Sequence, residues 1–297
     1  MTKTTTFAAT AAILLLTSGA ALGADGQDGT SGVDPRRFDL SVGIGASIRP
    51  VYEGSDEYEV RPVPILRPRF GNSTGGRLTF RGIDDVRINL SPWERIRFGG
   101  VVGYNFGRDE DDADRIDGLG DIDGGLIAGG FVGYDVIDTD TARWTASVAY
   151  SSQITGDAFD RDRFANVPGQ AGLAAFANEH GSQVDLSMAG SMILSPDLRM
   201  KTSFGTVYAD DDYMRTHFGI SQLQAANSTV GLAAFTPDAG LKSIYADVSF
   251  SYDLTERWQI TAGAGYSRLL NDAADSPVTA SENQLEGRLG VSYRFEF

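Results

Sequence analysis

Apolar and polar residues alternate one by one over most of the chain. From Phe38 onward the apolar side chains fall at every second position as far as Ile48, with polar or small residues between them. A period of two predicts a β-strand with one apolar and one polar face. The same pattern predicts about twelve strands, at residues 38–50, 57–70, 76–82, 84–91, 94–106, 124–137, 141–152, 183–194, 197–209, 241–253, 256–268 and 284–297.

The lengths of the connections favour a membrane barrel over a soluble β-sandwich, which would show the same alternation. Counted from the N-terminus, the even connections are short: 71–75, 92–93, 138–140, 195–196 and 254–255. Most odd connections are long: 107–123, 154–182, 210–240 and 269–283. Bacterial barrels have short periplasmic turns and longer extracellular loops. We therefore predict an all-β, antiparallel up-and-down transmembrane barrel of about twelve strands.

Aromatic residues support the same fold. In this threading they gather at both ends of the strands, as expected for rings that lie at the headgroup level of a bilayer. The final strand ends in the alternating row Tyr293, Phe295 and Phe297. This row is a candidate assembly signal that the barrel-assembly machinery would read, and the strand must also close the barrel against the first one.

The N-terminal residues have the pattern of a secretory signal. Lys3 is followed by the ten-residue apolar run Phe7–Leu16 and then by small residues. The run is too short to span a bilayer. We assign residues 1–24 to a signal peptide, cleaved after Gly23 or Ala24, residues 25–37 to a periplasmic segment, and residues 38–297 to the barrel. Such a chain would be exported to the outer membrane of a Gram-negative bacterium.

Composition excludes several functions. The 297 residues contain no Cys and only two His, and the formal net charge is −15. Without Cys there are no disulfides, Cys-ligated zinc sites or thiol nucleophiles. Multi-His metal sites are disfavoured, and an acidic chain is a poor nucleic-acid binder. We expect no cofactor and no bound metal.

Arginines gather on the polar face of the first five strands and form a candidate basic wall of the lumen. Its members are Arg49, Arg61, Arg67, Arg69, Arg77, Arg81, Arg87, Arg95 and Arg97. Such a wall could make an anion-selective pore, or it could pair with carboxylates and fill the lumen. Candidate inward acids are Asp39, Glu57, Glu59, Asp135, Asp185, Asp247, Glu286 and Glu296. Because these acids share the polar face, we expect the paired arrangement.

Two further features are weak signals of chemistry. Residues 109–123 contain eight acids, but their spacing does not match an EF-hand calcium loop. We interpret them as a solvated extracellular loop that meets lipopolysaccharide and outer-membrane lipid. A hydrolase would need a Ser–His pair oriented by a third group. His180 and His217 lie in long loops without a G-x-S-x-G motif, so we predict no enzyme and no catalytic residue.

Four loop segments carry a family resemblance: VYEGSDEY at 51–58, the acidic stretch at 108–123, DDYMRTHFG at 211–219 and SRLLNDAADSPV at 267–278 before the closing GVSYRFEF. In this order they resemble the MipA/OmpV family of outer-membrane proteins. The matching positions are Tyr52, Gly54, Ser55, Tyr213, Phe218, Gly219, Asp272, Asp275, Ser276 and Pro277.

The resemblance implies an outer-membrane barrel without catalytic residues. One member of the family is regarded as a scaffold that links a lytic transglycosylase to a penicillin-binding protein in peptidoglycan growth, and another is known as a porin-like surface protein. Two functions therefore stay open at this point, a scaffold and a small-solute, anion-preferring pore. The very short predicted periplasmic turns leave little surface for a scaffold to dock an enzyme.

Overall fold

The computed structural model describes residues 38–70, 78–80, 85–156 and 180–296. The predicted signal peptide, the segment 25–37 and Phe297 lie outside these residues.

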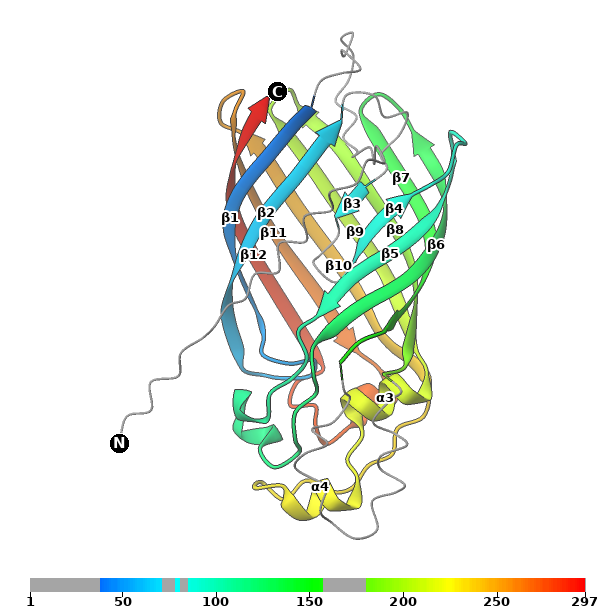
Figure 1. Cartoon of the computed structure of the whole chain (residues 1–297), viewed down its shortest axis with the longest axis vertical. Coiled ribbons are helices and arrows are strands. Elements are labelled where there is room, and N and C mark those ends of the chain that lie inside the picture. Colours follow the sequence, from blue (N-terminus) through cyan, green and yellow to red (C-terminus); the bar gives the residue numbers. More distant parts are fainter. Residues whose placement is uncertain (1–37, 71–77, 81–84, 157–179, 297) are drawn as a thin grey trace, which may run out of the picture.

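The described chain is an antiparallel up-and-down sheet that curls into a cylinder (Figure 1). Its strands follow the alternating segments of the sequence closely. They are β1 (Phe38–Pro50), β2 (Tyr58–Phe70), β3 (Leu78–Phe80), β4 (Val86–Asn89), β5 (Ile96–Asn105), β6 (Gly125–Asp138), β7 (Ala142–Gln153), β8 (Ser182–Ser195), β9 (Leu198–Ala209), β10 (Gly240–Asp253), β11 (Trp258–Leu269) and β12 (Asn283–Glu296).

Sequence neighbours pair along the sheet except for β2 and β3, and the last strand pairs with the first. The order is β2-β1-β12-β11-β10-β9-β8-β7-β6-β5-β4-β3. In the β1–β12 ladder, Ala46 lies opposite Leu289 and Ser47 opposite Arg288. This register keeps apolar with apolar and polar with polar, because a shift by one residue would exchange the two faces. The expected pairing of the final strand with the first is thus confirmed.

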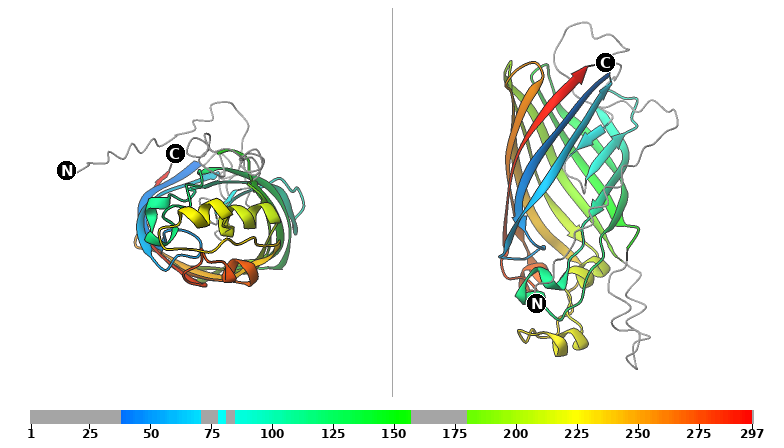
Figure 2. Two further views of the ribbon diagram at one scale, coloured as in Figure 1. Left: turned by 90° about the horizontal axis from the view of Figure 1, so that it is seen from below. Right: turned by 60° about the vertical axis from the view of Figure 1, so that its left-hand side comes forward.

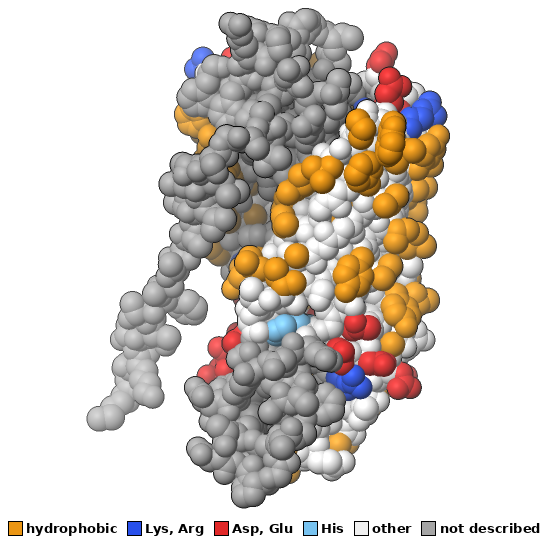
Figure 3. Space-filling model, turned by 45° about the vertical axis from the view of Figure 1, so that its right-hand side comes forward, with side chains coloured by type: hydrophobic (Ala, Val, Ile, Leu, Met, Phe, Trp, Pro, Cys, Tyr) orange, Lys and Arg blue, Asp and Glu red, His pale blue; other side chains and the backbone are white. Residues whose placement is uncertain are grey.

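Exposure of the side chains is inverted relative to a water-soluble protein. On β12, Leu289 is 62% exposed, whereas Ser292 is 3% exposed. On β1, Ile44 is 64% exposed and Ser47 is 7% exposed. Figure 3 shows apolar side chains spread along the wall, with acidic and basic side chains toward its ends. An apolar exterior around a polar interior is the arrangement that a bilayer requires of a barrel.

The two ends of the cylinder differ. At one end, the turn end, residues 90–95, 139–141, 196–197 and 254–257 make short connections, and the last strand finishes there. The opposite end, the loop end, carries the long connections and the helices (Figure 1). They include η1 (Glu110–Asp112), η2 (Asp114–Ile116), α3 (Asp211–Phe218), α4 (Gln222–Asn227) and α5 (Asn271–Asp275). No helix in the described ranges is long and apolar enough to cross a membrane.

β2 and β3 are the two ends of the sheet, and no ladder between them is present among the described residues. Contacts do cross this seam at the loop end. The guanidinium carbons of Arg49 and Arg61, from β1 and β2, lie 5.3 and 5.4 Å from the ring centroid of Phe106, which follows β5. These distances are those of cation–π contacts, so the edge formed by β2 meets the far end of the sheet at this level.

A charge on the outer face should interfere with insertion. We expect Leu289→Lys to reduce the folded, heat-modifiable form in outer membranes, because Lys at the midplane of a barrel exterior costs about 2–4 kcal/mol. Leu90→Lys is the matched control, since Leu90 is 61% exposed but lies in a turn. The measurement is the ratio of folded to unfolded bands on unheated gels. Equal ratios for the two variants would contradict the assignment of this face to lipid.

Candidate functional site

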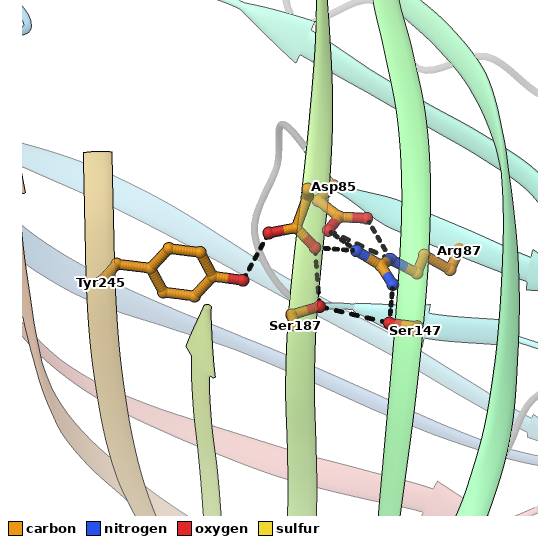
Figure 4. A network of polar contacts seen from close by, with 6 residues as sticks. Asp85, Arg87, Ser147, Ser187 and Tyr245 are labelled. Atoms are coloured by element: carbon orange, nitrogen blue, oxygen red, sulfur yellow. Dashed lines mark hydrogen bonds and ion pairs between the residues drawn. The ribbon is translucent and has the colours of Figure 1, made fainter. Parts of the chain in front are cut away.

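The interior of the cylinder contains a network of charged groups centred on Arg87 of β4 (Figure 4). Arg87 donates from Nε and Nη2 to the carboxylate of Asp85, with the shortest contacts at 3.0 Å. It also donates from Nη2 to Asp185 Oδ1 of β8 at 3.1 Å and from Nη1 to Ser147 Oγ of β7 at 2.9 Å. The guanidinium carbon lies 5.5 Å from the centroid of Phe131. These contacts join β4 to β7 and β8 across the interior.

The network extends from Asp185 to further strands. Ser187 Oγ and Tyr245 Oη donate to the Asp185 carboxylate at 2.7 and 2.6 Å. Tyr245 comes from β10, so it crosses β9 to reach β8. Gly205 of β9 makes this possible, because a Cβ there would lie 2.8 Å from Tyr245 Oη. One cluster therefore joins β4, β7, β8 and β10, which are not all neighbours in the sheet. Such a network fixes the relative positions of these strands more specifically than isolated ion pairs would.

A second interior pair is deeply buried. Arg97 of β5 donates from Nε to Asp135 Oδ2 of β6 at 2.9 Å, and the Asp135 side chain has no exposed area. Thr145 Oγ1 donates to the other carboxylate oxygen at 2.7 Å. Near the loop end, Arg49 and Arg61 share Glu59. Buried charges of this kind persist only when paired and hydrogen-bonded.

The structure places the predicted basic wall as follows. Arg49, Arg61, Arg87 and Arg97 face the interior and contact the carboxylates described above. Arg67 and Arg69 lie opposite Ser41 and Asp39 in the β1–β2 ladder, but their side chains, and the residues Arg77 and Arg81, lie outside the described part. Arg95 differs from the expectation. It precedes β5, is exposed, and hydrogen-bonds to Tyr134 of the outer face.

Sequence reasoning missed interior arginines of the later strands. Arg199 contacts Asp253 at 2.9 Å, and Arg288 contacts Asp247. Arg288 lies against Gly263, where an added Cβ would be 2.9 Å from its Nε. Both arginines occupy the polar face of their strands, so the alternation itself could have identified them. Arginines are densest in the first five strands, and this density draws attention away from the interior arginines of the later strands.

Four loops pack together across the loop end and form what we call the cap: residues 51–57, 106–124, 210–239 and 270–282. Figure 2 (left) shows α3 lying across the opening. Two apolar clusters hold the cap together. One contains Tyr52, Ala113, Ile116, Leu119, Ile220 and Val278, and the other Ala209, Met214, Phe218, Leu269 and Ala273. Ile116, Phe218 and Val278 have no exposed area, so the cap has an apolar core of its own.

The acidic segment 109–123 is part of this folded cap: its apolar residues are buried, whereas most of its acids are exposed to solvent as expected. Several of its acids accept hydrogen bonds from backbone amides. Asp109 Oδ1 accepts from Asp111 N at 3.0 Å, Asp121 Oδ1 from Glu110 N at 2.9 Å, and Glu110 Oε2 from Gly120 N at 2.9 Å. These short polar side chains therefore satisfy backbone donors in tight turns. In the described ranges, no group of three or more His, Asp or Glu is arranged to hold a metal ion.

The residues that carry the family resemblance meet in the cap, although they are far apart in sequence. Tyr52 donates to Val278 O at 3.0 Å, and Ser276 Oγ donates to Phe218 O at 2.6 Å. Pro277 O accepts from Arg115 Nε at 2.9 Å.

The remaining motif positions shape the loops. Gly54 has φ +101° and packs against Thr279, where a Cβ would lie 2.9 Å from Thr279 Oγ1, so only glycine fits. Gly219 ends α3, Asp272 accepts from Asp238 N at 2.8 Å, and Ser55 Oγ accepts from Glu57 N at 3.0 Å. Asp275 is the last residue of α5. The motif thus specifies how the cap folds.

A charged cluster fastens the cap to the wall. Lys242 of β10 lies with Nζ 2.7 Å from Glu53 Oε1, in the first loop, and 3.2 Å from Tyr213 Oη of α3. Tyr213 donates to Glu53 Oε2 at 3.0 Å. Burial alone would raise the pKa of Glu53, but Lys242, His217 and the Tyr213 hydroxyl hold that pKa below its ordinary value. Glu53 is therefore a carboxylate at neutral pH.

Both histidines of the chain line one small cavity between α3 and the wall. His180 precedes β8, and its Nε2 lies 2.5 Å from Gly156 O. His217 stacks on Tyr213, with ring centroids 4.2 Å apart. Burial lowers the pKa of His217 to about 3, and the cations Lys242 and Arg108 act in the same direction. His217 is therefore neutral at neutral pH and stacks on Tyr213 within the cap.

The ion pair that fastens the cap should contribute measurably to stability. We expect Lys242→Met to lower the free energy of unfolding by about 2 kcal/mol, because it leaves the Glu53 carboxylate without its cation. Adding Glu53→Gln should recover part of this loss. Urea titration in lipid vesicles measures both. The control pair is Arg268→Met with Glu282→Gln, whose side chains are about half exposed and should change stability by less than about 1 kcal/mol. Strictly additive effects of the two cap substitutions would exclude a direct pair.

Comparison with known proteins identifies a family that the chain matches. Residues 42–295 match the family model described as MltA-interacting protein MipA. Outer membrane protein YiaT of Escherichia coli K12 is 28% identical over 138 residues, which cover 46% of this chain and 54% of that protein. OmpV of Vibrio cholerae is 31% identical over 99 residues, 31% of this chain and 34% of that protein. The chain thus matches about half the length of the first of these relatives and about a third of the second.

A similar solved structure is an outer membrane channel from Pseudomonas putida F1, with 14% identity and a TM-score of 0.43 over 91% of this chain and 100% of that one. The relatives named above are outer-membrane proteins, and neither name is that of an enzyme. The expected location in the outer membrane of a Gram-negative bacterium is confirmed. The match over residues 42–295, together with the cap that the motif residues build, shows that the chain belongs to the MltA-interacting protein MipA family.

Proposed function

We propose that this protein is a closed, twelve-stranded outer-membrane barrel that does not conduct solutes and serves as an attachment point for a peptidoglycan-processing enzyme. One observation carries the first half of the proposal: the cap covers the loop end with an apolar core, while the interior guanidiniums described above contact carboxylates. An open pore would instead present unpaired charges to water and ions.

A closed barrel follows from the requirement that backbone hydrogen bonds in hydrocarbon be satisfied within the protein. An unpaired strand edge in hydrocarbon leaves backbone groups without partners. β2 and β3 are the two ends of the sheet, and the contacts of Arg49 and Arg61 with Phe106 draw these ends together. Pairing of β2 with β3 completes a barrel of twelve strands, an even number as in other bacterial barrels.

The second half of the proposal rests on the family. Its description names an interaction with MltA, and the resemblance of the loop motifs implies a scaffold for a lytic transglycosylase and a penicillin-binding protein. In a barrel with short periplasmic turns, the turn end faces the periplasm. Its described turns are short, so a partner would contact a rim of several turns at once, including residues 139–141 and 196–197.

A small-solute, anion-preferring pore is the second candidate, and one part of the interior favours it. Gly43 and Gly45 of β1 and Gly263 and Gly265 of β11 occupy polar-face positions, so these strands carry no side chain into the interior there. Arg288 and Asp247 nevertheless lie against Gly263 and Gly265. The space that the glycines leave is therefore at least partly occupied by a charged pair, which is why we place the scaffold first.

Conductance separates the two candidates. We expect purified full-length protein to give no steady current in planar bilayers. Ile116→Asp, which places a charge in the buried core of the cap, should increase leakage, whereas Val230→Asp should not, because Val230 of the same cap is 53% exposed. Incorporation is verified by flotation of proteoliposomes. Large, steady, anion-selective currents from the unaltered protein would make the pore the primary function.

Binding tests the scaffold directly. The full-length protein in nanodiscs should bind a purified lytic transglycosylase, and the turn-end change Asp140→Lys combined with Asp197→Lys should weaken binding several-fold. Asp111→Lys combined with Asp238→Lys on the cap is the control, because these two exposed positions make the same charge change at the opposite end. Biolayer interferometry gives the dissociation constants. Absence of binding, or equal weakening by the cap variant, would contradict a scaffold that acts through the turn end.

A further inference from the structure

Two arginines at the turn end differ from the charge-paired arginines of the interior. Arg95 and Arg257 are exposed, and neither forms an ion pair among the described residues. Each instead donates a hydrogen bond to a tyrosine hydroxyl. Arg257 Nη1 lies 3.2 Å from Tyr293 Oη, and the Arg95 side chain hydrogen-bonds to Tyr134. In a chain with 40 acids and 25 bases, an exposed arginine without a carboxylate is a notable arrangement.

The two pairs occupy equivalent positions in the sheet. Arg95 is the residue before β5, and Ile96 lies opposite Tyr134 of β6. Arg257 is the residue before β11, and Trp258 lies opposite Tyr293 of β12. The arginine carbonyls accept from Asp135 N and Arg294 N, both at 2.8 Å. The backbone of each arginine is therefore fixed by the neighbouring strand.

Both tyrosines belong to the aromatic border of the outer face. Tyr134 and Trp258 are exposed on it, and Trp258 contacts Tyr293 with ring centroids 5.0 Å apart. Tyrosine and tryptophan side chains border the hydrocarbon at the level of the headgroups. An arginine bound to such a tyrosine is held at that level, and its guanidinium has more N–H donors than this one bond uses.

Nearby acids do not compete strongly for these guanidiniums. Close to Arg95, Asp135 is bound by Arg97 and Asp138 by Arg143, the latter at 2.9 Å. Glu256 and Glu296 are the acids around Arg257, and neither forms an ion pair with it. A planar guanidinium matches the geometry of a phosphate.

We propose that Arg95 with Tyr134, and Arg257 with Tyr293, are two binding sites for the phosphate of anionic phospholipids in the leaflet that borders the turn end. The strands β7 to β10 lie between the two pairs in the sheet, so the sites are separate and each takes its own lipid. The guanidinium holds the phosphate, and the tyrosine hydroxyl fixes the guanidinium. Such contacts would set the depth and tilt of the barrel at this border.

Native mass spectrometry of the full-length protein in detergent, titrated with phosphatidylglycerol, tests the proposal. We expect up to two tightly retained lipids, and Arg95→Gln with Arg257→Gln should weaken their binding about five-fold at each site, the factor that one charge contributes at a lipid surface. Arg268→Gln is the control, because Arg268 is an exposed arginine of the loop end that contacts Glu282. Phosphatidylethanolamine should bind more weakly, and millimolar inorganic phosphate should not displace the lipid.

A second pair of substitutions separates a loss of lipid binding from a loss of folding. Tyr134→Phe with Tyr293→Phe keeps the rings and the charges but removes the hydroxyls, and it should weaken lipid binding less than the arginine changes. Heat-modifiable mobility verifies that each variant is folded. Equal lipid retention by the arginine variant and the unaltered protein would overturn the proposal, as would an equal loss in Arg268→Gln or full displacement by inorganic phosphate.

Discussion

The requirement that a sheet in lipid satisfy its backbone hydrogen bonds internally governs the rest of this structure. Apart from β2 and β3, the two ends of the described sheet, each strand pairs with its sequence neighbours, and β12 pairs with β1, because hydrocarbon offers no other partners to the backbone. The same environment assigns the apolar side chains to the exterior and therefore places every polar position of the alternation inside. Arg87 and Arg97 are buried, and Arg288 faces the interior, as a consequence of strand parity, and each contacts an interior carboxylate that makes its position tolerable.

The interior and the cap have different organisation. In the interior, specificity comes from charged side chains that cross several strands, as Arg87 and Tyr245 do when both reach Asp185. In the cap, it comes from apolar residues such as Ile116 and Phe218, which pack as in a small soluble domain. Lys242 and Glu53 join the two regions. This division explains why the family resemblance is concentrated in the loops: a cap must have a particular sequence to fold, whereas a wall needs mainly the alternation.

The position of an arginine relative to the wall decides its chemistry. Within the cylinder a guanidinium is desolvated and needs a carboxylate at contact distance. One residue before a strand, as at Arg95, the side chain leaves the interior and reaches a tyrosine on the outer border. Arg95 and Arg97 are two residues apart and share one parity, yet the first lies at the outer border and the second in the interior. Parity predicts the face of a side chain only while the backbone remains in the sheet.

The sequence by itself determined the strands, their faces and the asymmetry of the connections, because a period of two is a local property and each strand lies next to its sequence neighbour. It also determined which residues would be polar and inward, as at Arg97 and Asp135. Only the tertiary structure decided which charges meet. Arg87 contacts Asp85 beside it and reaches Asp185, and Tyr245 reaches the same Asp185 carboxylate, because the whole sheet curves. Likewise Tyr52 meets Val278, and Phe218 meets Ser276, because four loops end at the same rim. Such contacts depend on where distant strands lie in space, and local periodicity carries no information about that distance.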